Sequence, residues 1–257
     1  MNIRSVDATF GWRWIAAGMQ LFKKNPAQWL FMLGILFVAS RLLFMIPFMA
    51  LLVALLAPHF LAGLAHGAQA LEQGKPLRIG YLVSGFLRNA GSLATIGGIS
   101  LLGQVATFLV IVAVGGDAFS DLAKSMAGGG AATPEGMRAM QAAAPRMMLA
   151  MLAGFVVSLP LMMATWYAPL LVFFDDLKPA AALYMSLLAC IKNVLPLMVY
   201  GVVLMIPLFV FTRIGLALGV VDLGLWMLAP VIVPTIYASY RDLFVRTPTV
   251  EDTSAGL

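Results

Sequence analysis

The chain has 257 residues, of which 62% are hydrophobic and 11% are charged, whereas a soluble domain has about 45–50% apolar and about 25% charged residues. A water-soluble fold of this length has too little interior for so much apolar surface, so the composition predicts an integral membrane protein. The net charge of +5 fits cations gathered on one side of a membrane better than a nucleic-acid partner, and we expect none.

Six segments are apolar over roughly the 20 residues that a helix needs to cross a hydrocarbon core about 30 Å thick. They cover residues 27–46, 48–70, 90–115, 147–174, 194–212 and 216–240. The runs are continuous rather than alternating, which favours helices over a barrel. The sequence therefore predicts an all-α, polytopic transmembrane helix bundle of three helical hairpins, each preceded by an interfacial amphipathic helix.

The connection between the third and fourth predicted spans, residues 116–146, is an insert of about thirty residues. Residues 118–126 and 134–144 have the composition of short helices. The glycines at 128–130 lie between them and predict a flexible hinge.

A threefold repeat is suggested within this single integral membrane domain, residues 1–257, with units 8–76, 77–179 and 180–248. A basic residue followed by asparagine precedes a span at Asn25, Asn89 and Asn193, and an Ala-Pro pair follows in each hairpin at Pro58, Pro169 and Pro230. The alternative is that any helix bundle places cations at span ends and prolines inside spans.

An even number of spans puts both termini on one side, and the positive-inside rule chooses the side. That side carries eleven of the 16 lysines and arginines. We therefore expect cytoplasmic N- and C-termini in a bacterial inner membrane. Membrane lipids are the expected partners, with anionic headgroups against the cations of the interfacial corners, and a second copy or another membrane protein is left open. These cations are Arg13, Lys23, Lys24, Arg78, Arg88 and Lys192.

Ionisable groups and prolines inside spans offer an alternative function. His59 and His66 are seven residues apart and share a helix face, and a transporter or channel would use them, with Gln104 or Thr107, to line a mid-membrane cavity. Pro58, Pro169 and Pro230 could break helices around such a cavity. The competing interpretation is a pair of neutral histidines that hydrogen-bond across helices.

Enzyme chemistry has less support in the sequence. Asp175 and Asp176, beside Lys178, could perform acid–base work on a lipid, but a local ion pair in a solvated loop explains them as well. The single cysteine, Cys190, excludes an intramolecular disulfide, and no Cys/His cluster indicates a metal. We therefore expect no cofactor and no catalytic residue.

Three stretches carry a resemblance to known proteins: GWRWIAAGMQLFKKNPAQWL near the start, MMATWYAPLLVFFDDLKPAAALYMSLLACIKNVLPLMVYG in the middle and LAPVIVPTIYASYRDLF near the end. They resemble an uncharacterised family of proteobacterial multi-pass inner-membrane proteins and, more distantly, the YciC-like membrane proteins. The resemblance covers nearly the whole chain and matches the insert least. It implies a helical inner-membrane fold and no catalytic role, so we expect a non-enzymatic accessory or structural component that contacts lipid.

Overall fold

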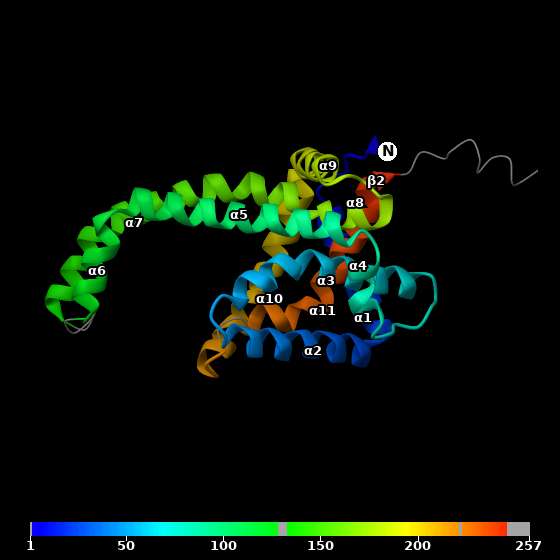
Figure 1. The fold of residues 1–257 in the computed structure, drawn as a ribbon, viewed down its shortest axis with the longest axis horizontal. Coiled ribbons are helices and arrows are strands. Elements are labelled where there is room, and N and C mark those ends of the chain that lie inside the picture. The colour runs from blue at the N-terminus through cyan, green and yellow to red at the C-terminus, as the bar shows by residue number, and fades with distance from the viewer. Residues whose placement is uncertain (1, 128–132, 221–222, 246–257) are drawn as a thin grey trace, which may run out of the picture. The chain divides into compact units, whose positions relative to one another are not determined.

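The computed structural model describes residues 2–127, 133–220 and 223–245, which fold almost entirely into helices (Figure 1). In chain order the elements are β1 (Asn2–Ile3), α1 (Phe10–Lys24), α2 (Pro26–Phe44), α3 (Met49–Glu72), α4 (Tyr81–Leu87), α5 (Ala90–Gly115), α6 (Asp117–Ala127), α7 (Pro134–Trp166), α8 (Ala168–Asp175), α9 (Pro179–Lys192), α10 (Val194–Ala217), α11 (Leu223–Leu243) and β2 (Phe244–Val245).

Six stretches of helix among the described residues are long and apolar enough to cross a membrane. They are α2, α3, α5, the consecutive α7 and α8, α10 and α11. The predicted all-α bundle with six spans is confirmed. Short helices precede three of the spans: α1 before α2, α4 before α5, and α9 before α10.

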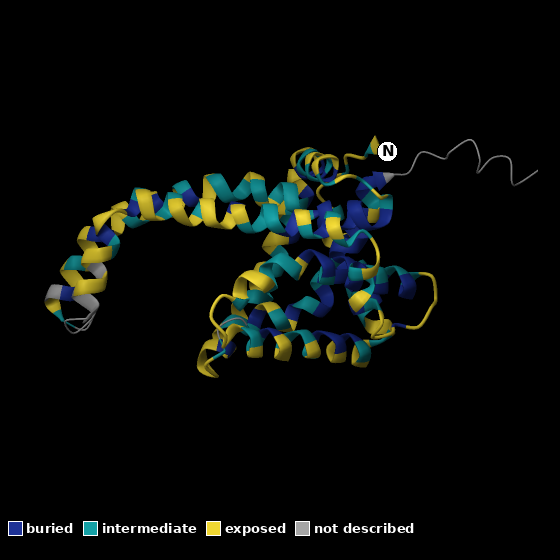
Figure 2. Ribbon diagram, in the orientation of Figure 1, coloured by how far each residue is buried: buried dark blue, intermediate teal, exposed yellow. Residues whose placement is uncertain are grey.

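The chain forms two compact units, Met1–Gly97 with Met163–Leu257, and Gly98–Met162. In the first unit α11 is the central helix, since 67% of its most apolar 18-residue window is buried, against 11% for α10. The largest fully buried side chains include Trp14, Trp29 and Tyr167. Dark blue ribbon in Figure 2 marks this core where α1, α3, α8 and α11 pack.

Each short helix of the first unit packs against a returning span. Helix α1 packs against α11, α4 against α3, and α9 against α8. The α3–α4 contact is close enough to require glycine on both helices: a Cβ on Gly63 would meet the backbone oxygen of Tyr81, and a Cβ on Gly85 would meet the backbone of His59. Small residues allow such close approach of helices in membrane proteins.

The three asparagines of the repeated motif each lie at the junction between a short helix and a span. The Asn25 side chain caps α2 by accepting a hydrogen bond from Gln28 N at 3.3 Å. Pro26 follows in the first turn of that helix, where its missing N–H costs nothing. Asn89 has a left-handed backbone, with φ of 56°. Asn193 is buried between α9 and α10.

The N-terminal segment of the first unit meets the end of α11. Strand β1 pairs antiparallel with β2, with Asn2 opposite Val245 and Ile3 opposite Phe244, and Arg4 N donates to Leu243 O at 2.9 Å. The N-terminal segment and the end of α11 therefore lie side by side.

The second unit contains most of α5, α6 and most of α7. Gly103 on α5 approaches the side chain of Leu161, and Gly154 on α7 approaches that of Ile111. The separate helix expected over residues 134–144 is instead the start of α7, which continues from Pro134 through Pro145 to Trp166. Alanines before Pro145 favour continuation of the helix, and a proline is tolerated inside a long apolar helix. The glycines at 128–130 lie outside the described residues.

Candidate functional site

A network of charged and aromatic side chains joins the ends of α3 and α11 to α1. Glu72 accepts a hydrogen bond from the Tyr237 hydroxyl at 2.7 Å and forms an ion pair with Arg241. Arg241 also pairs with Asp242 at 3.0 Å, and Asp242 accepts from Trp14 Nε1 at 3.1 Å. These partners hold the C-terminal ends of two spans together.

The two aspartates considered for acid–base chemistry lie at the end of α8 and are both engaged. Asp176 pairs with Arg88 at 2.7 Å and accepts from Asn89 Nδ2 at 2.7 Å. Asp175 accepts a hydrogen bond from the Tyr240 hydroxyl. The ion pair anticipated at this position is present, but its cation comes from the α4–α5 junction. We call the C-terminal ends of α3, α8 and α11 the polar end. It contains Glu72, Asp175, Asp176, Tyr240, Arg241 and Asp242, together with Arg88 and Asn89, which contact Asp176.

The six cations expected at the headgroups are all exposed: Arg13, Lys23, Lys24, Arg78, Arg88 and Lys192. Lys24 donates to Leu71 O at 2.9 Å, where a cation stabilises the C-terminal end of α3. Arg88 is held by Asp176, and Arg13 stacks over the Phe10 ring with 4.9 Å to its centroid. Arg13, Lys23 and Lys24 lie in α1 and Lys192 ends α9, whereas Arg88 directly follows α4 and Arg78 lies in the loop before it.

The two histidines of α3 are packed among aromatic rings rather than facing one another across a cavity. His59 is buried, its Nε2 lies 3.1 Å from Ala90 O, and its ring stacks on Phe86 with 4.6 Å between centroids. His66 meets the ring of Tyr81 edge-on at 4.8 Å. The histidines thus contact α4 and the start of α5.

The prolines named from the sequence occupy two kinds of position. Pro58 and Pro230 lie inside α3 and α11, whereas Pro169 is in the first turn of α8, directly after helix α7 ends. At that break the backbone N–H of Tyr167 donates to Ser186 Oγ at 2.9 Å, and Ser186 donates to Met163 O at 2.7 Å. A side chain from α9 therefore satisfies backbone groups that the break frees.

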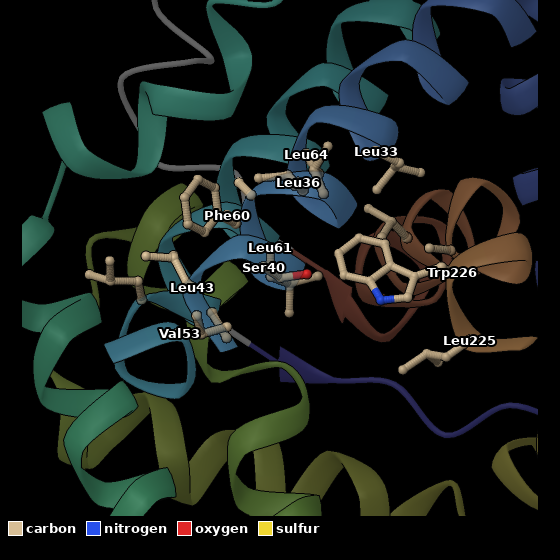
Figure 3. A pocket seen from close by; sticks show the side chains of 15 residues that line it. Leu33, Leu36, Ser40, Leu43, Val53, Phe60, Leu61, Leu64, Leu225 and Trp226 are labelled. Atoms are coloured by element: carbon tan, nitrogen blue, oxygen red, sulfur yellow. The ribbon is translucent and has the colours of Figure 1, made fainter. Parts of the chain in front are cut away.

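A hydrophobic groove between α2, α3 and α11 was not anticipated from the sequence. Its volume is about 370 Å³, and a smaller cavity of about 100 Å³ lies between α2 and α11. Figure 3 shows leucine and phenylalanine side chains around the groove, with the Trp226 ring on one side. The lining residues are Leu33, Leu36, Ala39, Ser40, Leu43, Val53, Leu56, Ala57, Phe60, Leu61, Leu64, Leu225, Trp226, Ala229 and Val233.

The groove is apolar throughout. Its one hydroxyl, on Ser40, donates to Phe37 O at 2.8 Å within the same helix. Water gains no partners from such walls, so apolar matter is the filling that the groove favours. Neither His59 nor His66 lines this groove or the smaller cavity.

Comparison with known proteins supports the membrane assignment. A probable inner membrane protein of Burkholderia thailandensis is 28% identical over 262 residues, which cover 95% of this chain and 94% of that protein. The chain is a multi-pass inner membrane protein. No family model and no solved structure matches it. The expected likeness to an inner-membrane protein is confirmed, and the more distant likeness to YciC-like proteins stays a prediction.

Proposed function

We propose that this inner membrane protein is a non-enzymatic structural component that has both termini in the cytoplasm and binds anionic lipid headgroups at its polar end. The observation that supports the proposal most is the exposure of all six cations, of which Lys23, Lys24, Arg88 and Lys192 flank the junctions where the chain enters its spans. The β1–β2 pair and the hydrogen bond from Arg4 N to Leu243 O put the N-terminal strand beside the end of α11, where Arg241 and Asp242 belong to the polar end.

The cations differ in what they can offer a lipid. Arg88 is already neutralised by Asp176, whereas the exposed Lys23, Arg78 and Lys192 keep their charge for the membrane surface. A lysine or arginine near an anionic leaflet contributes on the order of 1 kcal/mol. Several such residues on a rigid frame favour anionic over zwitterionic lipid without any deep headgroup pocket.

The other functions considered have weaker support. An enzyme needs acid, base or nucleophile groups that converge on a substrate. Asp175 is instead hydrogen-bonded to the Tyr240 hydroxyl, and Asp176 is held by an ion pair with Arg88 and a hydrogen bond from Asn89. A channel through the histidines needs polar walls, but His59 and His66 pack on aromatic rings.

The lipid proposal is tested by thermal unfolding of the purified protein with added phosphatidylglycerol or phosphatidylcholine. We expect phosphatidylglycerol to raise the unfolding temperature more, and the double variant K23A/R78A to lose much of that difference. The matched control K124A/R138A removes one lysine and one arginine, both exposed, from the second unit, and should keep the difference. Equal loss in both variants, or no preference for the anionic lipid, would contradict the proposal.

The orientation is tested separately with reporters fused after residue 257. A fluorescent protein that folds only in the cytoplasm should be active there, and alkaline phosphatase, which is active only outside it, should not. The opposite pair of results would reverse the predicted topology.

A further inference from the structure

The hydrophobic groove has the length of one leaflet of a bilayer. On α2 it extends from Leu33 to Leu43, and on α3 from Val53 to Leu64, which at 1.5 Å per residue is roughly 15 Å in each case. A hydrocarbon core is about 30 Å thick, so each leaflet supplies about half of that. The groove lies toward the end of α2 and the beginnings of α3 and α11, away from the polar end.

The volume also has the scale of a single acyl chain. A water-sized group takes about 30 Å³, so 370 Å³ holds about a dozen such groups, and a methylene is close to that size. Two independent measures, length and volume, therefore agree on a chain of about a dozen methylenes that runs along the groove.

We propose that the groove binds one acyl chain of a membrane phospholipid, in the leaflet remote from the polar end. This deepens the lipid contact of the proposed function and relies on it only for the name of the leaflet, which is periplasmic when the termini are cytoplasmic. Walls of leucine, valine, phenylalanine and tryptophan supply dispersion contacts to a flexible chain. Acyl chains are also the apolar groups that surround a membrane-spanning bundle at this depth.

Two other occupants fit the groove less well. A helix of a second copy has a diameter of about 10–12 Å with its side chains, which is too wide for a space of this volume. The C-terminal residues of this chain that follow β2 include Glu251 and Asp252. A carboxylate in a dry apolar groove would be strongly disfavoured.

The test reconstitutes the full chain in vesicles of phosphatidylethanolamine and phosphatidylglycerol that contain a phospholipid with a photoactivatable group in its acyl chain. Irradiation followed by peptide mass spectrometry locates the label. We expect the label to concentrate on α2 and α3 residues of the groove, well above its level on other exposed apolar residues such as Leu102 and Phe155. Labels spread in proportion to exposure would overturn the proposal.

Substitutions that fill the groove make the test specific. Ala57 and Ala39 line the groove and are exposed within it, so A57F and A39F should occupy the space without disturbing the core and lower groove labelling at least fivefold. The control A50F adds the same ring to an exposed residue of α3 that does not line the groove, and should leave the labelling unchanged. Unchanged labelling in both filled variants would overturn the proposal. So would a groove that takes no lipid label and is instead cross-linked to a second copy of the chain. Headgroup preference is measured separately, so each proposal can fail alone.

Discussion

The α3–α4 contact gives the sharpest test of the packing. A Cβ on Gly85 would lie against the backbone of His59, with its carbonyl carbon at 2.9 Å and its Cα at 3.0 Å. Backbone atoms cannot rotate away as a side-chain tip can, so G85A must push α4 from α3. Overpacking of this kind lowers the free energy of unfolding by about 1–3 kcal/mol. In a protein of this size, each kcal/mol lost lowers the unfolding temperature by about 2–4 °C.

The matched control is G34A, on the membrane-spanning helix α2, where a new Cβ has no atom within 4 Å. It should be neutral or raise stability by about 0.5–1 kcal/mol, because alanine loses less backbone entropy in a helix than glycine does. Both variants are compared with the parent by thermal unfolding in detergent, followed by size-exclusion chromatography. If G85A unfolds at or above the temperature of G34A, the close approach of α3 and α4 is wrong.

Further predictions concern the asparagine junctions and the Cys190 thiol. The Asn193 side chain accepts a hydrogen bond from Val6 N and donates to two backbone carbonyls, so N193A should lower the free energy of unfolding by about 1–3 kcal/mol. N25A removes one long capping hydrogen bond and should lower it less. At position 89, N89G should lower the free energy of unfolding less than N89A, because only glycine adopts the left-handed backbone freely. Burial raises the pKa of the Cys190 thiol to about 12, so a maleimide at pH 8 should label the unfolded chain and leave the folded one unlabelled. The folded thiol holds its proton to higher pH than the unfolded one. Its contribution to stability is therefore complete below about pH 8.5 and is lost as the pH rises toward 12. In the same unfolding assay, a C190A variant should lose less stability than the parent over this alkaline range.

Hydropathy and local chemistry were enough to predict the spans and the junctions between each short helix and the span that follows it. A membrane span needs a long uninterrupted apolar run, and such runs can be read without knowing which helices touch. The cap at Asn25 and the proline after it were likewise predictable, because both act within one turn of their own helix. The start of α7 was not, since an alanine-rich segment before Pro145 reads equally well as a separate helix.

The candidate sites depend on pairings that no single segment encodes. Glu72 and Tyr237 are 165 residues apart, and Arg88 and Asp176 are 88 apart, so only the folded chain brings them together. The groove is harder still to predict. A leucine that lines it and a leucine that faces the surrounding lipid have the same sequence signal, because neighbouring helices, rather than the residue itself, decide which one it is.

The packing of the short helices bears on the repeat. We propose that the three repeat units 8–76, 77–179 and 180–248 are related. The short helix α4 of repeat 77–179 packs on α3 of repeat 8–76, and the short helix α9 of repeat 180–248 packs on α8 of repeat 77–179. In the same way, α1 of unit 8–76 packs on α11 of unit 180–248. That contact joins segments far apart in the sequence, which gives a physical reason for the β1–β2 pair and for the hydrogen bonds between Asn193 and the N-terminal segment: they hold these distant segments together.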